Sequence, residues 1–168
     1  MEIRRLDEGD ALAFRVLYLC ALYEHPEAFI AAYEEEQSEP VERMAERLRA
    51  STPENFYVGA FVDGRLVGIA HFERQAGTKV RHRAYIGGMY VALEKRGLGI
   101  GRALLDWAIA HARSLPELEE VGLWVIIGNE PAQALYKSAG FEVFCIEPRA
   151  IKIQGRYYDG AGMILRLR

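Results

Sequence analysis

The chain has 168 residues, of which 51% are hydrophobic and 27% are charged, and its formal net charge is −3. This length fits one domain over residues 1–168, and the balance of apolar and charged residues excludes an intrinsically disordered or collagen-like chain. A negative net charge also excludes the strongly basic profile of a nucleic-acid-binding domain, so we expect no nucleic-acid partner.

No segment reads as a membrane span or a secretory signal. The first ten residues contain no apolar core, and the longest strongly apolar run, residues 121–127, is too short to cross a bilayer. We therefore expect a cytoplasmic protein without a membrane partner. The two cysteines, Cys20 and Cys145, are predicted to be free thiols, with a single disulfide as the alternative. Neither the cysteines nor the histidines have the spacing of metal ligands, so no metal is expected.

The N-terminal part of the chain predicts one strand and two helices. Alternating apolar residues favour a short strand at residues 2–6, and residues 7–10 supply acidic capping groups for a helix that runs to about Tyr23. A second helix is expected at about residues 41–50, and the acidic segment between the helices has no assigned structure. The core-facing stripe predicted for the first helix comprises Leu12, Val16, Leu19 and Leu22.

The middle of the chain predicts three strands. Residues 56–62 and 65–74 are apolar and β-prone, and they flank Asp63-Gly64, the strongest hairpin turn signal in the sequence. A third strand is expected at residues 81–91. This strand contains Gly87-Gly88, and glycines inside a strand indicate a bulge or a close approach by another group.

Helices and strands alternate in the remaining residues. The elements expected are helices at 99–115 and 129–139 and strands at 121–127, 141–153 and 157–167. Apolar residues at helical spacing predict the first helix, and Asn129 is a good cap for the second. The continuous apolar run 121–127 predicts a central strand that is buried on both faces.

The expected element order along the chain is β-α-α-β-β-β-α-β-α-β-β, which is an α/β (α+β) fold with about four helices. Strand 81–91, helix 99–115 and strand 121–127 form a βαβ unit, whose two strands should be parallel. The other connections favour antiparallel neighbours. We therefore predict a mixed, mostly antiparallel sheet of six to seven strands.

A glycine-rich turn, Arg96–Arg102, follows a predicted strand and opens a predicted helix. Such a turn can bring backbone N–H groups close to a phosphate, and Lys95 and the two arginines add positive charge. Its glycines, at positions 97, 99 and 101, do not have the spacing of G-x-G-x-x-G, and the G-K-[ST] triplet of a P-loop is missing. A plain strand-to-helix turn is the alternative to an anion site.

Two motifs carry a resemblance to a known family. Arg96-x-x-Gly99-x-Gly101 resembles the acyl-CoA pyrophosphate loop of the GNAT superfamily, the acetyl-CoA-dependent N-acetyltransferases, and Met89-Tyr90-Val91 looks like the strand end beside the cofactor. The run Asn129-x-x-Ala132-x-x-Leu135-Tyr136-x-x-x-Gly140-Phe141 is similar to the second cofactor motif of the same family. Both motifs occur at the family's spacing and cover residues 84–141, so the chain is identified as a member of this superfamily.

This resemblance implies a mixed sheet split by a bulge, with acetyl-CoA in the V-shaped opening between two central strands. It also implies direct transfer of an acetyl group, within a ternary complex, to a primary amine of a small molecule, a peptide or a protein, with a homodimer as a possible assembly. The residues implied in cofactor binding are Met89, Tyr90, Val91, Arg96, Gly97, Leu98, Gly99, Ile100, Gly101, Arg102, Asn129, Ala132 and Tyr136.

The resemblance makes Tyr136 the expected catalytic residue, since the family places a tyrosine here to protonate the departing CoA thiolate; packing alone is the alternative. Many members carry a glutamate base on the strand before the glycine turn, but residues 83–90 contain no carboxylate. Glu73, His71 and Tyr85 are the candidate bases in its place, each with a surface or packing role as the alternative. The missing carboxylate also motivates an alternative function, a non-catalytic acyl-CoA-binding sensor on the same fold.

The resemblance implies that the acceptor side includes the segment between the first two helices, residues 24–42. This segment contains seven glutamates, together with Phe29 and Tyr33. Such an acidic, aromatic wall would attract a cationic amine. The alternative is that residues 34–36 are only a solvated helix face. The acceptor itself is not identified by the sequence.

Overall fold

The computed structural model describes residues 1–167. Within these residues the chain forms one seven-stranded sheet with the order β1-β2-β3-β4-β5-β7-β6. Its strands are β1 (Glu2–Arg5), β2 (Asn55–Val62), β3 (Arg65–Arg74), β4 (Arg83–Val91), β5 (Glu120–Ile126), β6 (Glu142–Ile153) and β7 (Arg156–Arg166). All neighbouring strands are antiparallel except β4 and β5, which confirms the predicted mixed, mostly antiparallel sheet.

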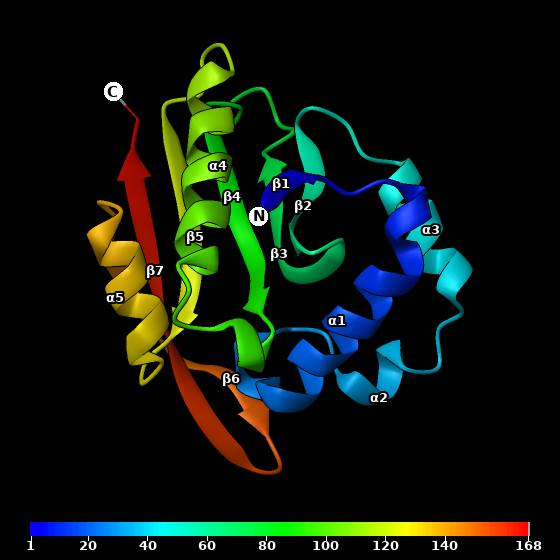
Figure 1. Ribbon diagram of the computed structural model, residues 1–168. Helices are drawn as coiled ribbons and strands as arrows, with labels where there is room; N and C mark the ends of the chain where they lie inside the picture. Colours follow the sequence, from blue (N-terminus) through cyan, green and yellow to red (C-terminus); the bar gives the residue numbers. More distant parts are fainter. Residues whose placement is uncertain (168) are drawn as a thin grey trace.

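Helices cover both faces of this sheet (Figure 1). They are α1 (Ala11–Glu24), α2 (Tyr33–Glu36), α3 (Val41–Arg49), α4 (Ile100–Ser114) and α5 (Glu130–Ser138), with short 3-10 turns η1 (Glu8–Asp10), η2 (Pro26–Ala28) and η3 (Leu93–Lys95). Adjacent residues of β2 show which helix covers which face, because successive side chains of a strand point to opposite faces. The Tyr57 ring packs 4.6 Å from Phe14 of α1, whereas the Phe56 ring packs 5.7 Å from Trp107 of α4. Thus α1 and α4 lie on opposite faces.

The parallel strands β4 and β5 pair only over a short distance. Arg83–Tyr85 pairs with Glu120–Gly122, and no further residues of the two strands are in register. The pairing of β4 with β3 also shifts at this point, since Gly87 lies opposite His71 and Gly88 adopts a φ of +56°. The bulge predicted from Gly87-Gly88 is therefore present, and β4 and β5 separate beyond it.

The predicted element order is confirmed, with small differences at the ends of elements. The acidic segment that had no assigned structure contains the one-turn helix α2, so the part of the chain up to Leu167 has five α-helices rather than about four. Strand β4 begins at Arg83 rather than at residue 81, because the preceding residues form turns closed by the bonds Val80 N–H to Gly77 O and Arg83 N–H to Val80 O.

The core-facing stripe predicted for α1 is wrong at two positions. Leu12 and Val16 are 64% and 55% exposed, whereas Phe14, Leu17 and Ala21 are buried. Helix α1 is apolar around most of its circumference, so its periodicity does not identify the buried side. Packing against Tyr57 places Phe14 inward, and this contact fixes the rotation of the helix. Leu22 is buried as predicted.

Strand β5 is not buried on both faces as its apolar run suggested. Val121, Leu123 and Val125 are buried on one face, but Trp124 on the other face is 48% exposed. Helix α1 packs against Tyr57 of β2 and against β3, and Trp124 on β5 stays uncovered.

The structure also bears on the cysteines, on membrane-spanning helices and on groups of metal-ligating side chains. Cys20 and Cys145 are both free thiols. From Met1 to Leu167, no helix is both long enough and apolar enough to span a membrane. Over the same residues, no group of three or more histidine, cysteine or acidic side chains is placed to hold a metal ion.

Candidate functional site

The glycine-rich turn joins β4 to α4 and has the backbone geometry of a ligand-binding turn. Gly97 and Gly99 have φ values of +75° and +77°, in the region that favours glycine. A Cβ atom built at either position would meet nothing within 4 Å, so the turn is open at both glycines. Helix α4 begins immediately afterwards at Ile100, and its leading N–H groups have no acceptor within the helix. An anion placed at this turn would be favoured by these donors and by the helix dipole.

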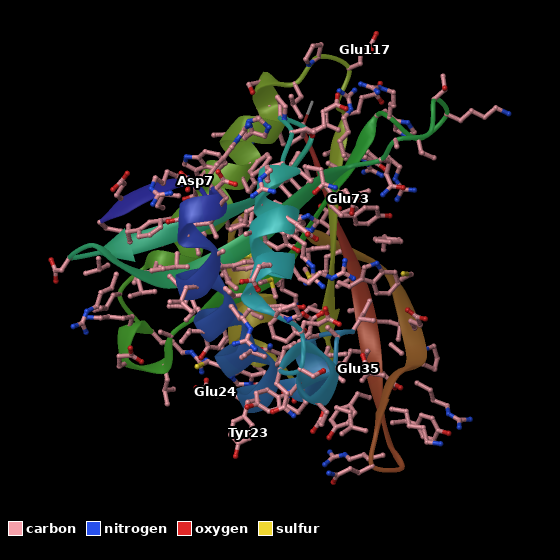
Figure 2. The ribbon with its side chains drawn as sticks, turned by 90° about the vertical axis from the view of Figure 1, so that its right-hand side faces the viewer. Asp7, Tyr23, Glu24, Glu35, Glu73 and Glu117 are labelled. Carbon is pink, nitrogen blue, oxygen red and sulfur yellow. The ribbon has the colours of Figure 1, made fainter. Side chains whose placement is uncertain are left out.

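Arg96 connects this turn to the end of α1. Its Nε–H donates to the carbonyl of Val91 at 2.9 Å, and its Nη2 lies 3.2 Å from the Glu24 carboxylate and 3.1 Å from His25 Nε2. The guanidinium also lies over the Tyr90 ring, at 5.4 Å from its centroid. Figure 2 shows Glu24 at the C-terminal end of α1. Arg96 is therefore held beside the turn.

The other predicted residues of the turn contribute in different ways. Ile100 is buried in the core, so only its backbone faces the turn, whereas Leu98 is 66% exposed. A Cβ at Gly101 would lie 3.5 Å from Leu135 of α5 and 3.8 Å from Val91. Arg102 pairs with Asp106 at 2.8 Å and reaches the Ser138 hydroxyl at 3.4 Å. Residues 101 and 102 therefore border the space between α4 and α5.

The end of β4 holds the three residues predicted beside the cofactor, but their side chains face different neighbours. Tyr90 donates its hydroxyl hydrogen to Glu24 at 2.8 Å and is buried. The carbonyl of Val91 accepts from Arg96. Met89 instead has its sulfur 3.7 Å from the hydroxyl of Tyr136. Thus Met89 and Tyr136 meet across the opening between β4 and the β5–α5 unit.

Tyr136 is buried on α5, with 8% of its surface exposed. Burial raises the pKa of its hydroxyl to about 12, so the group stays protonated at neutral pH. Asn129 positions this helix, because its side-chain oxygen accepts from the N–H of Ala132 at 3.3 Å. The predicted capping role of Asn129 is confirmed.

Of the three candidate bases, His71 lies nearest to the bulge. It pairs across the sheet with Gly87, whereas Glu73 pairs with the third candidate, Tyr85, two residues before Gly87 on β4. His71 stacks on Tyr57 and its Nε2 lies 2.8 Å from the Asn55 side-chain oxygen. Burial lowers the pKa of His71, so its ring is neutral at pH 7.

An apolar cavity of about 270 Å³ lies on the open face of β5. We call it the β5 cavity; its principal lining residues are Glu27, Phe29, Ile30, Trp124, Glu147 and Ile151. It adjoins the part of β5 that no longer pairs with β4. Only part of the acidic segment reaches it: Glu27, Phe29 and Ile30 do. Tyr33 packs instead against Tyr23, and Glu36 pairs with Arg47 at 3.1 Å; Figure 2 shows Glu35 on α2.

Comparison with known proteins shows which family this chain, with its split sheet and glycine-rich turn, belongs to. The profile of the Acetyltransferase (GNAT) family matches residues 14–141. The chain belongs to this family. Among curated relatives, the N-alpha-acetyltransferase RimI of Mycobacterium tuberculosis is 35% identical over 106 residues, covering 62% of this chain and 63% of that protein. Mycothiol acetyltransferase of Propionibacterium freudenreichii subsp. shermanii is 39% identical over 80 residues, covering 48% of this chain and 25% of that protein.

A solved structure also has the same GNAT fold. The protein yncA of Salmonella typhimurium, solved with its cofactor acetyl-CoA, aligns with a TM-score of 0.87 at 24% identity, covering 100% of this chain and 94% of that chain. The GNAT chain thus spans less than two thirds of the two curated relatives but nearly all of this structural neighbour.

The sequence reasoning missed the β5 cavity of this GNAT chain. The sequence predicts only strand positions for Trp124, Glu147 and Ile151. The available signal was the glycines of β7: a Cβ at Gly160 would lie 3.2 Å from Ala150 and 3.7 Å from Trp124, and one at Gly162 would lie 2.8 Å from the Phe144 ring. Glycines inside a strand often mark a close approach, which here is that of Ala150 and Trp124 at Gly160 and of Cys145 and Phe144 at Gly162.

Proposed function

We propose that this GNAT chain, acting as one domain over residues 1–168, transfers an acetyl group from acetyl-CoA to a primary amine by direct attack within a ternary complex. The separation of β4 from β5 is the observation that carries the proposal. It leaves backbone groups of β4 without strand partners, and a ligand with amide groups can pair with them as an added strand would. The open glycines of the adjoining turn fit the phosphates of the same donor.

Each part of the donor has residues suited to it in this proposal. The backbone amides of Gly97 to Arg102 hold the pyrophosphate, and the cations Arg96 and Arg102 add charge beside it. The backbone of Met89, Tyr90 and Val91 pairs with the pantetheine amides. On α5, Asn129, Ala132 and Tyr136 border the arm that carries the thioester.

Tyr136 acts as the general acid in this proposal. Its hydroxyl lies at the opening, beside Met89, and its raised pKa keeps the proton in place until a thiolate forms nearby. A free thiol has a pKa of about 8.5, but a thiolate formed in the same buried opening is also destabilised, which favours proton transfer to it. A tyrosine at this point therefore supplies the proton that the leaving group needs.

The attacking amine must be neutral, so a group on the acceptor side has to accept a proton. His71 suits this role best among the three candidate bases, because it lies opposite the bulge and is neutral at pH 7. Transfer can run directly or through water. The names of the relatives also support transfer to an amine, since RimI is named for N-alpha-acetylation and a second relative for acetylation of mycothiol.

Binding of acetyl-CoA and release of free CoA test the proposal separately. We expect binding of acetyl-CoA by calorimetry and release of CoA with at least one amine of a broad panel. Gly101→Val should abolish binding, because its methyl groups enter the space next to Leu135 and Val91. Ala110→Val, which introduces the same residue at an exposed position of α4, is the control and should bind normally.

Two outcomes count against the proposal. Unchanged affinity in a folded Gly101→Val variant would refute the assigned donor site. Binding without turnover on the whole panel would instead favour the alternative, a non-catalytic acyl-CoA-binding sensor.

A further inference from the structure

The β5 cavity has a composition that indicates which amine it accepts. Its lining is predominantly aromatic and aliphatic, and its only charged members are Glu27 and Glu147. We propose, resting on the acetyltransferase function above, that the acceptor is a primary ammonium compound with a flat or branched apolar group close to the nitrogen. The apolar group lies against Trp124, and the two carboxylates attract the ammonium.

The size of the cavity limits the acceptor. Pockets for drug-sized ligands measure roughly 300–1,000 Å³, and the β5 cavity, at about 270 Å³, is slightly smaller. It therefore suits one small amine or the first side chain of a peptide, but not several residues of a peptide. The donor opening lies alongside, because Trp124 is two residues beyond Gly122, the last β5 residue that pairs with β4.

Trp124 forms a flat apolar wall of the cavity, and the neighbouring strand β7 leaves its ring accessible. Its ring lies 6.2 Å from the Phe144 ring in an edge-to-face arrangement, and both side chains are about half exposed. Gly160 and Gly162 of β7 leave the space beside these rings that larger residues would fill. A half-exposed tryptophan that has glycines beside it on the neighbouring strand offers a large apolar area to a ligand.

The charges around the cavity favour a cation over an anion. Glu27 has one weak contact, 3.6 Å from His25 Nδ1, and Glu147 is in none of the ion pairs found among residues 1–167. The two cations on the same strand as Glu147 contact the Tyr157 ring instead of the carboxylates. The guanidinium of Arg149 lies 3.7 Å from the centroid of this ring, and the ammonium of Lys152 lies 5.1 Å from it. The lining itself contains no lysine or arginine. An amine in its ammonium form is therefore attracted before it loses its proton to the base.

The test compares matched acceptors that differ only in the apolar group. One pair is 2-phenylethylamine and 2-aminoethanol; the other pair is the peptides Phe-Gly-Gly and Ser-Gly-Gly. We expect kcat/KM to favour the apolar member at least about tenfold in one pair, since burying an aromatic side chain contributes that much. The pair in which the preference appears distinguishes a small amine from a peptide N-terminus.

Variants assign the preference to the cavity. Trp124→Ala should lower kcat/KM for the apolar member about tenfold and leave the polar member unchanged, whereas Trp124→Phe should keep most of the preference. Val143→Ala, at an exposed apolar residue of β6 outside the cavity, is the control. Replacing Glu27 and Glu147 by glutamine should raise KM for both members of a pair, by up to about fivefold for each carboxylate, and weaken its dependence on salt.

Binding measurements keep this inference separate from the proposed activity. Calorimetry with protein and CoA measures the affinity for each amine without any transfer. A preference in binding without release of CoA would support the cavity assignment and refute the transferase. Equal kcat/KM within both pairs, or an equal loss for both members in a Trp124→Ala variant that still binds acetyl-CoA, would overturn the inference.

Discussion

Tyr136 combines a buried hydroxyl with a position at the gap in the sheet, beside Met89. We predict that Tyr136→Phe lowers kcat by about 10²–10⁴-fold with little change in acetyl-CoA affinity, because packing is kept and the transferable proton is lost. Release of CoA under saturating donor measures this change. Tyr23→Phe, at a side chain that is 74% exposed, is the control and should have normal turnover. Normal kcat in Tyr136→Phe would reduce Tyr136 to a packing residue.

Sequence and structure agree on the glycine-rich turn but not on Trp124, and the difference has a physical reason. The turn could be predicted because Gly97 and Gly99 occupy backbone conformations that other residues avoid. The exposure of Trp124 could not, since a continuous apolar run looks the same whether or not helices cover both faces. Coverage is decided by distant segments, here by where α1 to α3 end on the sheet.

The 3-10 turn η1, which leads into α1, is stabilised by two aspartates whose contribution to stability can be measured. Asp7 accepts from Gly9 N–H, and Asp10 accepts from Asp7 N–H, which forms a capping box. Asp10 also binds Arg4 of β1 through two bonds of 2.7 and 2.8 Å. The acidic residues predicted to cap α1 therefore cap the 3-10 turn η1 that leads into it, whereas Asp10, the N-cap residue of α1 itself, makes no side-chain bond to that helix. The pair with Arg4 joins this turn to β1.

We predict that Asp10→Ala lowers the free energy of unfolding by about 1–2 kcal/mol, since it removes a cap and a bidentate ion pair. The hydrogen bond from Arg4 lowers the pKa of Asp10 in the folded protein. The contribution is therefore complete above the unfolded pKa of about 3.9 and is lost as pH falls through the folded value. Urea unfolding at pH 7 and in acid measures it. Glu46→Gln, at an exposed pair with Arg43, should change stability little.

The rotation of α1 is a second feature of the fold that the sequence could not determine. Leu12 and Val16 follow the same spacing as true core residues, yet they line an open cavity of about 720 Å³ beside β2 and β3. The other side of the helix buries Phe14, Leu17 and Ala21, with Phe14 packed against Tyr57, and this leaves Leu12 and Val16 exposed. The type and order of elements were predictable, but the choice between two apolar sides of one helix was not.

At the scale of the whole molecule, stability should depend on the charge of His111. This side chain of α4 lies among the rings of Phe56, Phe72 and Trp107, and its Nε2 is 2.7 Å from the carbonyl of Pro53. Burial lowers the pKa of His111 in the folded state. The unfolded chain therefore binds more protons between the folded pKa and about 6.5, and the fold loses stability as pH falls through this range.

We predict that the free energy of unfolding declines between pH 7 and pH 5, with a slope of at most about 1.4 kcal/mol per pH unit for each histidine involved. His71 contributes in the same direction, because burial lowers its pKa as well. Urea unfolding of His111→Asn across this range should give a shallower slope, whatever its stability at pH 7. An unchanged slope would show that His111 does not carry the effect.

The junction of Glu24, Tyr90 and Arg96 gives the molecule a shared anchor. One carboxylate at the end of α1 receives the hydroxyl of Tyr90 and the guanidinium of Arg96, and η2 begins two residues further on. The rim of the β5 cavity and the glycine-rich turn are therefore both connected to the carboxylate-bearing end of α1 at Glu24. We expect a movement of one region to displace the other. A substitution that breaks the contacts of Glu24 would therefore affect both the β5 cavity and the proposed site for the donor.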